Sequence, residues 1–159
     1  MPLTIRQATP ADAPVVIEFN RRLAEESEGV TLDPAVLAAG VAAVLADPVK
    51  GPYFLAEEGG EALGQMGVTT EFSDWRNGWL WWIQSVYVRA DARRAGVFRG
   101  LYEHLVAAAR QDPAVIGLRL YVERENTRAQ QTYLSLGMSD ASYYLFDLYP
   151  LPGRESHFR

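Results

Sequence analysis

Hydrophobic positions along the chain follow two periods, and the changes from one to the other separate expected strands from expected helices. Alternating or continuous runs rich in aromatic and β-branched residues predict strands. We expect these strands at residues 3–8, 53–57, 62–72, 79–88, 118–122 and 143–149.

Helical spacing of apolar residues fills the intervals between these strands, and each helix carries recognisable end signals. Thr9-Pro10 and Asp33-Pro34 place a capping side chain and then a proline at the first helical position of two N-terminal helices. Asp112-Pro113 ends a third helix, and Asn126 begins a fourth. A meander of strands followed by strand–helix–strand units predicts a mixed α/β sheet with helices on both faces.

Length and composition limit the alternatives. We expect one domain over residues 1–149 and a C-terminal tail at 150–159, because 159 residues suit a single core. With no cysteine and only two histidines, the chain offers no thiolate site, and neither a metal centre nor a Ser-His-Asp triad is expected. No run is apolar enough to cross a membrane and no signal peptide is recognisable, so we expect a cytoplasmic protein without membrane association.

Charge is unevenly distributed. Residues 1–88 contain 12 acidic and 5 basic residues, whereas residues 89–159 contain 8 acidic and 10 basic residues. An acidic half and a more basic half suit an enzyme that takes a cationic substrate and an anionic cofactor, although surface solvation alone explains the same pattern. The sequence pI of about 5.0 disfavours a nucleic-acid surface.

The most informative stretch runs from Val88 to Leu105, where a buried strand leads through a basic turn into an amphipathic helix. The first backbone N–H groups of such a helix have no intrahelical partner and face outward at its positive end. Gly96 lets the backbone approach an anion closely, and Arg93, Arg94 and Arg99 add cations. This turn predicts a phosphate site, with an ordinary strand–helix connection as the alternative.

A second stretch favours the phosphate site over the ordinary connection. Asn126, Ala129, Tyr133 and Gly137 match the pattern N-x-x-A-x-x-x-Y-x-x-x-G-F except for Met138 at its end. Together with Arg93-x-x-Gly96 at the preceding turn, this pattern resembles the two central motifs of the GNAT superfamily of acyl-CoA-dependent N-acetyltransferases. The sequence departs from the first motif at Phe98, where relatives have a small residue.

The resemblance, which covers residues 5–148, implies a GNAT-like mixed sheet of six or seven strands, splayed apart at the cofactor site. It implies acetyl-CoA as the cofactor, with its pyrophosphate on the basic turn and its pantetheine arm paired with the backbone of the central strand. The cofactor-binding residues implied are Val86, Tyr87, Val88, Arg93, Arg94, Ala95, Gly96, Val97, Phe98, Arg99, Asn126 and Tyr133.

Catalytic roles also follow from the resemblance. Tyr133 matches the tyrosine that points at the thioester sulfur, and a phenol can protonate the departing thiolate. Many relatives carry a glutamate on the central strand, but Gln84 and Ser85 stand there in this chain. We therefore favour Glu71 over Glu123 as the general base, with Gln84 orienting the amine or a water. A base acting through water, or no dedicated base, remains an alternative.

The expected acceptor is the amine of a small molecule or peptide, which Glu26, Glu28 and Trp75 would help to bind. The two glutamates come from the helix that forms a wall of the acceptor site in the resembled family, and an aromatic wall can hold an alkylammonium. A homodimer is compatible with the resemblance. The alternative function is an acyl-CoA-binding sensor or regulatory module with little catalysis, which the missing glutamate on the central strand supports.

Overall fold

The computed structural model describes residues 1–157. They form two compact units, residues 1–119 and residues 120–157, each of which is described by itself. The expectation of a single domain over residues 1–149 stays a prediction.

The first unit contains a five-stranded sheet in which the strands follow one another in sequence order. All neighbouring strands are antiparallel except the last two, which are parallel. The strands are β1 (Thr4–Gln7), β2 (Tyr53–Glu58), β3 (Glu61–Ser73), β4 (Gly78–Val88) and β5 (Val115–Arg119). The mixed α/β class is confirmed, with five strands where six or seven were expected.

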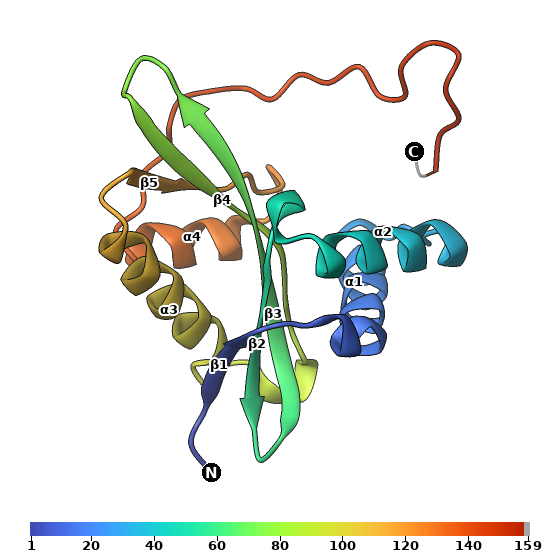
Figure 1. The fold of residues 1–159 in the computed structure, drawn as a ribbon, viewed down its shortest axis with the longest axis vertical. Helices are drawn as coiled ribbons and strands as arrows, with labels where there is room; N and C mark the ends of the chain where they lie inside the picture. The colour runs from blue at the N-terminus through green and yellow to red at the C-terminus, as the bar shows by residue number, and fades with distance from the viewer. Residues whose placement is uncertain (158–159) are drawn as a thin grey trace. The chain divides into compact units, whose positions relative to one another are not determined.

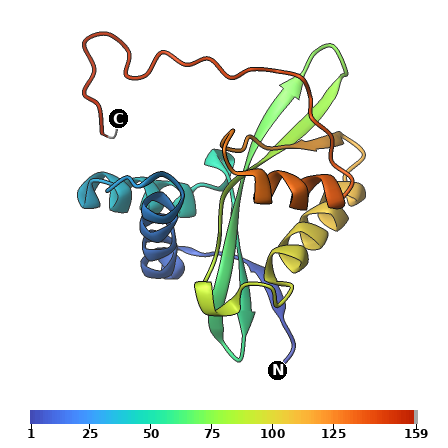
Figure 2. The same cartoon turned by 180° about the vertical axis from the view of Figure 1, so that it is seen from behind.

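Helices cover both faces of this sheet. The two N-terminal helices lie on one side of the strands and the third lies on the other, and both views agree on this (Figures 1 and 2). They are α1 (Ala13–Glu28), α2 (Pro34–Ala46) and α3 (Val97–Gln111); the short turns η1 (Pro10–Asp12), η2 (Pro48–Lys50) and η3 (Ala90–Ala92) connect the elements.

Close packing fixes which side chains face which helix. On the α3 side, a Cβ at Gly64 would lie 2.9 Å from Val97 Cγ1, so only glycine lets α3 begin this close to β3. On the α1 side, an apolar cluster joins the two N-terminal helices to β2 around buried Val16, Val41 and Leu55. The sheet therefore holds the start of α3 on one face and the two N-terminal helices on the other.

The helix ends follow the expected local chemistry. The Asp33 carboxylate accepts hydrogen bonds from the N–H groups of Ala35 and Val36 at 2.9 and 3.2 Å, and Gly29 ends α1 in the left-handed region at φ +63°. Asp12 accepts the Thr9 N–H at 2.7 Å, and the guanidinium of Arg6 lowers the pKa of Asp12 to about 2. These contacts anchor the chain where it leaves β1.

Two expected strands differ from the structure. The strand expected at residues 118–122 is β5 at Val115–Arg119, because its pairing with Trp79–Trp82 of β4 sets its limits. Residues 143–149 contain no strand. Their pattern suits one, but a strand needs a hydrogen-bonded neighbour, and the apolar side chains of this segment are 48–90% exposed. These are Tyr143, Tyr144, Leu145, Phe146, Leu148 and Tyr149.

The second unit contains one helix, α4 (Thr127–Ser135), among its described residues. Asn126 caps it as expected, since its side chain accepts the N–H of Ala129 at 3.1 Å. Gly137, at φ +94°, follows the helix in the conformation that favours glycine.

Candidate active site

The turn before α3 has the backbone geometry of an anion site. Arg94 and Gly96 both have positive φ, +66° and +82°, and no side chain caps the helix at Gly96. The first bond of the helix runs from the N–H of Gly100 to the carbonyl of Gly96 at 2.9 Å, so the N–H groups between these residues precede the helical ladder. Successive N–H groups in such a turn point toward one concave surface.

The space around this turn fits a phosphate. Residues 93–96 are exposed, and a Cβ at Gly96 would meet no atom within 4 Å. Phe98 does not close the turn, because its ring packs along the helix with its centroid 6.1 Å from that of Tyr102. Val97 is buried beneath the turn, so its backbone rather than its side chain is available to a ligand. The residues present therefore fit the pyrophosphate of a nucleotide cofactor.

Arg93 does not point freely into the turn. Its Nε donates to the carbonyl of Val88 at 3.0 Å, and its guanidinium pairs with Glu26 at 2.5 Å. The same guanidinium lies over the ring of Tyr87, whose hydroxyl donates to Glu26 at 3.2 Å. The Arg93 pair lowers the pKa of Glu26, which is thus a fixed anion that ties the end of α1 to the loop after β4.

Beside this loop, one edge of β4 is not paired with β5. The β4–β5 ladder extends from Trp79 to Trp82 only, so the rest of β4 has no partner in β5. On the other edge, two residues of β4, Ser85 and Val86, face one residue of β3, Met66. This β-bulge lies inside the open stretch and leaves backbone groups outside the regular ladder. Val86 and Val88 lie in this stretch of β4 that β5 does not pair, and the expected splaying of the strands stays a prediction.

A second group of polar side chains lies on the α1 face of the sheet, beyond the bulge. Trp82 Nε1 and Arg119 both donate to Glu71 Oε1 at 3.1 Å, and the Arg119 guanidinium lies 5.9 Å from the Trp82 ring centroid. Gln84 donates to the hydroxyl of Thr69 at 3.2 Å. Glu71 and Gln84 thus lie on one face, as their predicted roles require, but the charge of Glu71 is balanced by Arg119.

The other predicted acceptor residues are not brought to this group. Glu26 contacts Tyr87, which lies five residues beyond Trp82 on β4 and thus roughly 15 Å along the strand. Trp75 is 89% exposed in the turn between β3 and β4, and Glu28 is the exposed last residue of α1. Glu26 therefore lies beside the loop before α3, through its pair with Arg93, and its predicted role in acceptor binding stays a prediction.

Tyr133 lies in the second unit, on α4, two turns after Asn126. Burial raises the pKa of its phenol above 10.0, since the charged phenolate is disfavoured away from water. The hydroxyl therefore keeps its proton at neutral pH, which a general acid needs. Its role stays a prediction.

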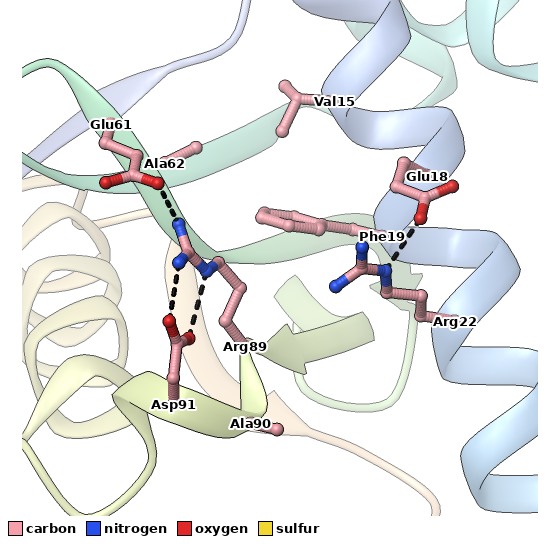
Figure 3. Close-up of a pocket in the computed structure, with 9 residues that line it drawn as sticks. All are labelled: Val15, Glu18, Phe19, Arg22, Glu61, Ala62, Arg89, Ala90 and Asp91. Atoms are coloured by element: carbon pink, nitrogen blue, oxygen red, sulfur yellow. Dashed lines mark hydrogen bonds and ion pairs between the residues drawn. The ribbon is translucent and has the colours of Figure 1, made fainter.

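A cavity of about 490 Å³ lies between α1 and the end of β4 (Figure 3). The charged side chains in it pair with one another: Arg89 with Glu61 and Asp91, and Arg22 with Glu18. Such mutual pairing leaves little to recognise a charged ligand. The cavity is lined by Val15, Glu18, Phe19, Arg22, Glu61, Ala62, Arg89, Ala90 and Asp91.

No group of three or more histidine, aspartate or glutamate side chains within residues 1–157 could hold a metal ion. Over the same residues, no helix is both long and apolar enough to span a membrane.

Sequence reasoning missed three residues of this region. Arg119 balances Glu71, and Gln65 and Asn20 form a hydrogen bond beneath the bulge at 2.8 Å. Gln65 offered a signal, because it is a polar residue in the middle of the otherwise apolar strand segment at residues 62–68. Asn20 and Arg119 offered none, since their partners are distant in the chain.

Comparison with protein families gives one match. The model of the acetyltransferase (GNAT) family matches residues 18–138, which include the turn before α3, the bulge and α4. A comparison with curated protein sequences gave no significant match.

Solved structures with the same fold are numerous. A possible acetyltransferase from Clostridium difficile 630 is 40% identical, with a TM-score of 0.87 over 93% of this chain and 97% of that chain. A predicted acetyltransferase from Clostridium acetobutylicum, solved with acetyl-CoA, is 18% identical, with a TM-score of 0.75 over 92% and 96%. Glucosamine-6-phosphate N-acetyltransferase from Arabidopsis thaliana is 19% identical, with a TM-score of 0.71 over 94% and 99%. At these lower identities the likeness concerns the fold.

Proposed function

Because the chain belongs to the acetyltransferase (GNAT) family, we propose that it transfers an acetyl group from acetyl-CoA to a primary amine of a small molecule or peptide. Members of this family use acetyl-CoA, which supplies the acetyl group as a thioester. The observation that carries the proposal is the anion-binding turn of Arg94 and Gly96, which follows directly on the open, bulged stretch of β4.

Each part of this region has a role in direct transfer. The N–H groups at the start of α3, together with Arg94 and Arg99, hold the pyrophosphate. Backbone groups at Val86 and Val88 pair with the pantetheine arm, and an N–H there polarises the carbonyl. The amine nitrogen forms a bond to the acetyl carbon as the carbon–sulfur bond breaks. The amine loses one proton to a base or water, and the thiolate gains one; the family motif of α4 is our reason for assigning that proton to Tyr133.

The base is the least determined part of this reaction. Glu71 is the predicted candidate, but its carboxylate is already held in an ion pair with Arg119 and accepts a hydrogen bond from Trp82. Gln84 and Thr69 are neutral and orient the amine or a water by hydrogen bonding. We therefore favour Glu71 as an electrostatic and positioning partner of the amine, with proton removal by water as the alternative.

A second candidate function is an acyl-CoA-binding sensor. The observation in its favour is that the predicted base is already held in an ion pair with Arg119. Release of free CoA from acetyl-CoA across a panel of amines separates the two functions. Amine-dependent release supports the transferase, whereas tight acetyl-CoA binding without release by any amine supports the sensor.

The same assay tests whether the acceptor substrate is a cation. We expect Glu71→Gln to lower kcat/KM for a cationic amine a few-fold, since Glu71 is exposed and an exposed carboxylate–ammonium pair contributes about 0.2–1 kcal/mol. The effect should shrink at high salt. Glu26→Gln should instead raise KM for acetyl-CoA a few-fold, because the Glu26–Arg93 pair ties the loop before α3 to α1 and so keeps the phosphate-binding turn ordered.

Glu58→Gln is the matched control for this charge change, because Glu58 is exposed at the far end of β2. A best substrate that is neutral or anionic, with a KM indifferent to salt and to Glu71→Gln, would contradict the cationic acceptor. In that case the acidic N-terminal half serves solvation alone.

The homodimer is also a proposal, and the exposed apolar segment at residues 143–149 supports it. A second copy that covered this segment would remove large aromatic side chains from water. We expect the purified protein to have the mass of a dimer in light scattering, and Phe146→Asp to shift it toward the monomer. Val49→Asp, at a valine that is 91% exposed on η2, should leave the mass unchanged. A monomeric wild-type protein at high concentration would contradict the proposal.

A further inference from the structure

A buried hydrogen-bond network lies beneath the bulge of β4. The side chain of Gln65, on β3, is fully buried, and its Nε2 donates to Asn20 Oδ1 at 2.8 Å and to the carbonyl of Ser85 at 3.0 Å. Asn20 in turn donates to the Tyr53 hydroxyl at 3.3 Å. Gln65 therefore connects α1 to the backbone of β4 through its two amide protons.

The carbonyl that Gln65 holds belongs to the most unusual backbone position of the strand. Ser85 has φ +50°, in the left-handed region that residues with a Cβ rarely adopt. It lies in the bulge, where Ser85 and Val86 together face Met66. A conformation of this kind persists only where surrounding contacts enforce it. The bond to Gln65 is such a contact, since it acts on the Ser85 carbonyl itself.

Burial of the Gln65 side chain has a free-energy cost. Among the described residues, no donor lies within hydrogen-bond distance of its Oε1, although the atom is buried. Burying an acceptor without a partner is unfavourable, and a nonpolar residue of similar length would avoid the cost. The two donated bonds are therefore the feature that distinguishes glutamine from methionine here.

We propose that Gln65 is a positioning residue for acyl transfer, which fixes the Ser85–Val86 bulge and thereby aims the unpaired backbone groups of β4 at the acetyl donor. This inference rests on the proposed function, in which Val86 pairs with the donor. Gln65 acts through Ser85 and does not touch the substrate. The bulge also places Gln84 and Tyr87 on the α1 face together, because an inserted residue shifts the alternation by one.

Gln65→Met tests this role, because it keeps the length of the side chain and removes both donated bonds. We expect kcat/KM for acetyl-CoA to fall about tenfold or more, and the acetyl-CoA Kd from calorimetry to rise by a similar factor. Val68→Ala is the control for a weakened core: Val68 is buried on the same strand and pairs with Ile83, outside the bulge. It should lower Tm and leave kcat/KM within about twofold.

Ser85→Gly distinguishes a positioning role of Gln65 from a purely structural one. Glycine adopts positive φ without strain, so the bulge then depends less on Gln65. We expect Gln65→Met to cost no more than about threefold when Ser85 is already glycine. The inference is overturned if Gln65→Met lowers kcat/KM by the same factor in the Ser85→Gly protein as in the wild type. It is also overturned if Gln65→Met alone retains wild-type kcat/KM.

Asn20→Leu covers the case in which Gln65→Met does not fold. It removes one anchor of Gln65 from a half-buried position on α1 and leaves the bond to Ser85, so we expect a loss of about threefold that Ser85→Gly again reduces. An Asn20→Leu protein with wild-type kcat/KM and acetyl-CoA Kd would overturn the inference.

The outcome is separable from the proposed function. If the wild-type protein releases no CoA with any amine, transfer fails as a function, while calorimetry of the same variants still measures the effect of the bulge on acetyl-CoA affinity. If the wild type turns over and the variants match it, only the role of Gln65 fails.

Discussion

Replacing Gly96 by glutamate is expected to lower the affinity for acetyl-CoA by about 100-fold. The substitution places a carboxylate at the N-terminus of α3, where the helix dipole and the N–H groups of the turn receive phosphate oxygens. A Cβ at this position meets no atom within 4 Å, so the fold has room for the new side chain. Calorimetric titration of the folded variant with acetyl-CoA measures the loss.

Two controls separate charge from backbone strain. Gly153 has almost the same φ, +83°, and equally open surroundings, so Gly153→Glu introduces the same residue under the same strain in the C-terminal tail. It should bind acetyl-CoA normally. Gly96→Ala should retain most of the affinity, because it adds the strain of a Cβ at positive φ, about 1–2 kcal/mol, without the carboxylate. Undiminished binding by Gly96→Glu would show that phosphate does not occupy this turn.

The parts of the fold that were predictable are those in which neighbouring residues act on each other. Asp33 caps α2 through N–H groups two and three residues away, and Gly59 and Gly60 both have positive φ in the hairpin between β2 and β3. The turn before α3 belongs to the same class. Its arginines, its glycine and the helix that follows are contiguous, so their joint function could be inferred before the fold was known.

Pairing between distant segments was less predictable. The residues of β5 and those after it have similar strand propensity, and the ladder with Trp79–Trp82 decides which of them form the strand. Residues 143–149 have the composition of a strand and no hydrogen-bonded neighbour among the described residues. Propensity describes what a segment tolerates, whereas a strand also needs a partner.

The missed contacts of the site have the same origin. Glu71 shares a face of the sheet with Gln84, but its ion pair joins it to Arg119, 48 positions away. The positive φ of Ser85 depends on an insertion in the β3–β4 register, which no local pattern encodes. Only the inward-facing Gln65 offered a signal of a functional constraint, as a buried polar group in an apolar layer.

Replacing Tyr133 by phenylalanine is expected to lower kcat by about 100-fold, with acetyl-CoA affinity little changed. The ring stays and fills the same volume, while the proton that the departing thiolate needs is removed, and a positioned acid typically contributes 10²-fold or more. Single-turnover and steady-state rates with the best amine of the panel measure the effect.

The pH dependence gives an independent test of Tyr133. The protonated phenol is the active form, and burial raises its pKa above 10.0, so ionisation of this residue removes activity only above that pH. We expect kcat of the wild-type protein to show no loss from this group from neutral to mildly alkaline pH, because the raised pKa keeps the phenol protonated there. The residual kcat of Tyr133→Phe should show no dependence on a group that titrates above pH 10.

A control with the same chemical change distinguishes catalysis from packing. Tyr102 is half-buried on α3 and packs against Phe98, so Tyr102→Phe also removes one hydroxyl from a helical tyrosine. Its kcat should equal that of the wild type. If Tyr133→Phe also retains full kcat while single-turnover rates show that chemistry limits turnover, the thiolate takes its proton from another donor, and Tyr133 has a packing role only.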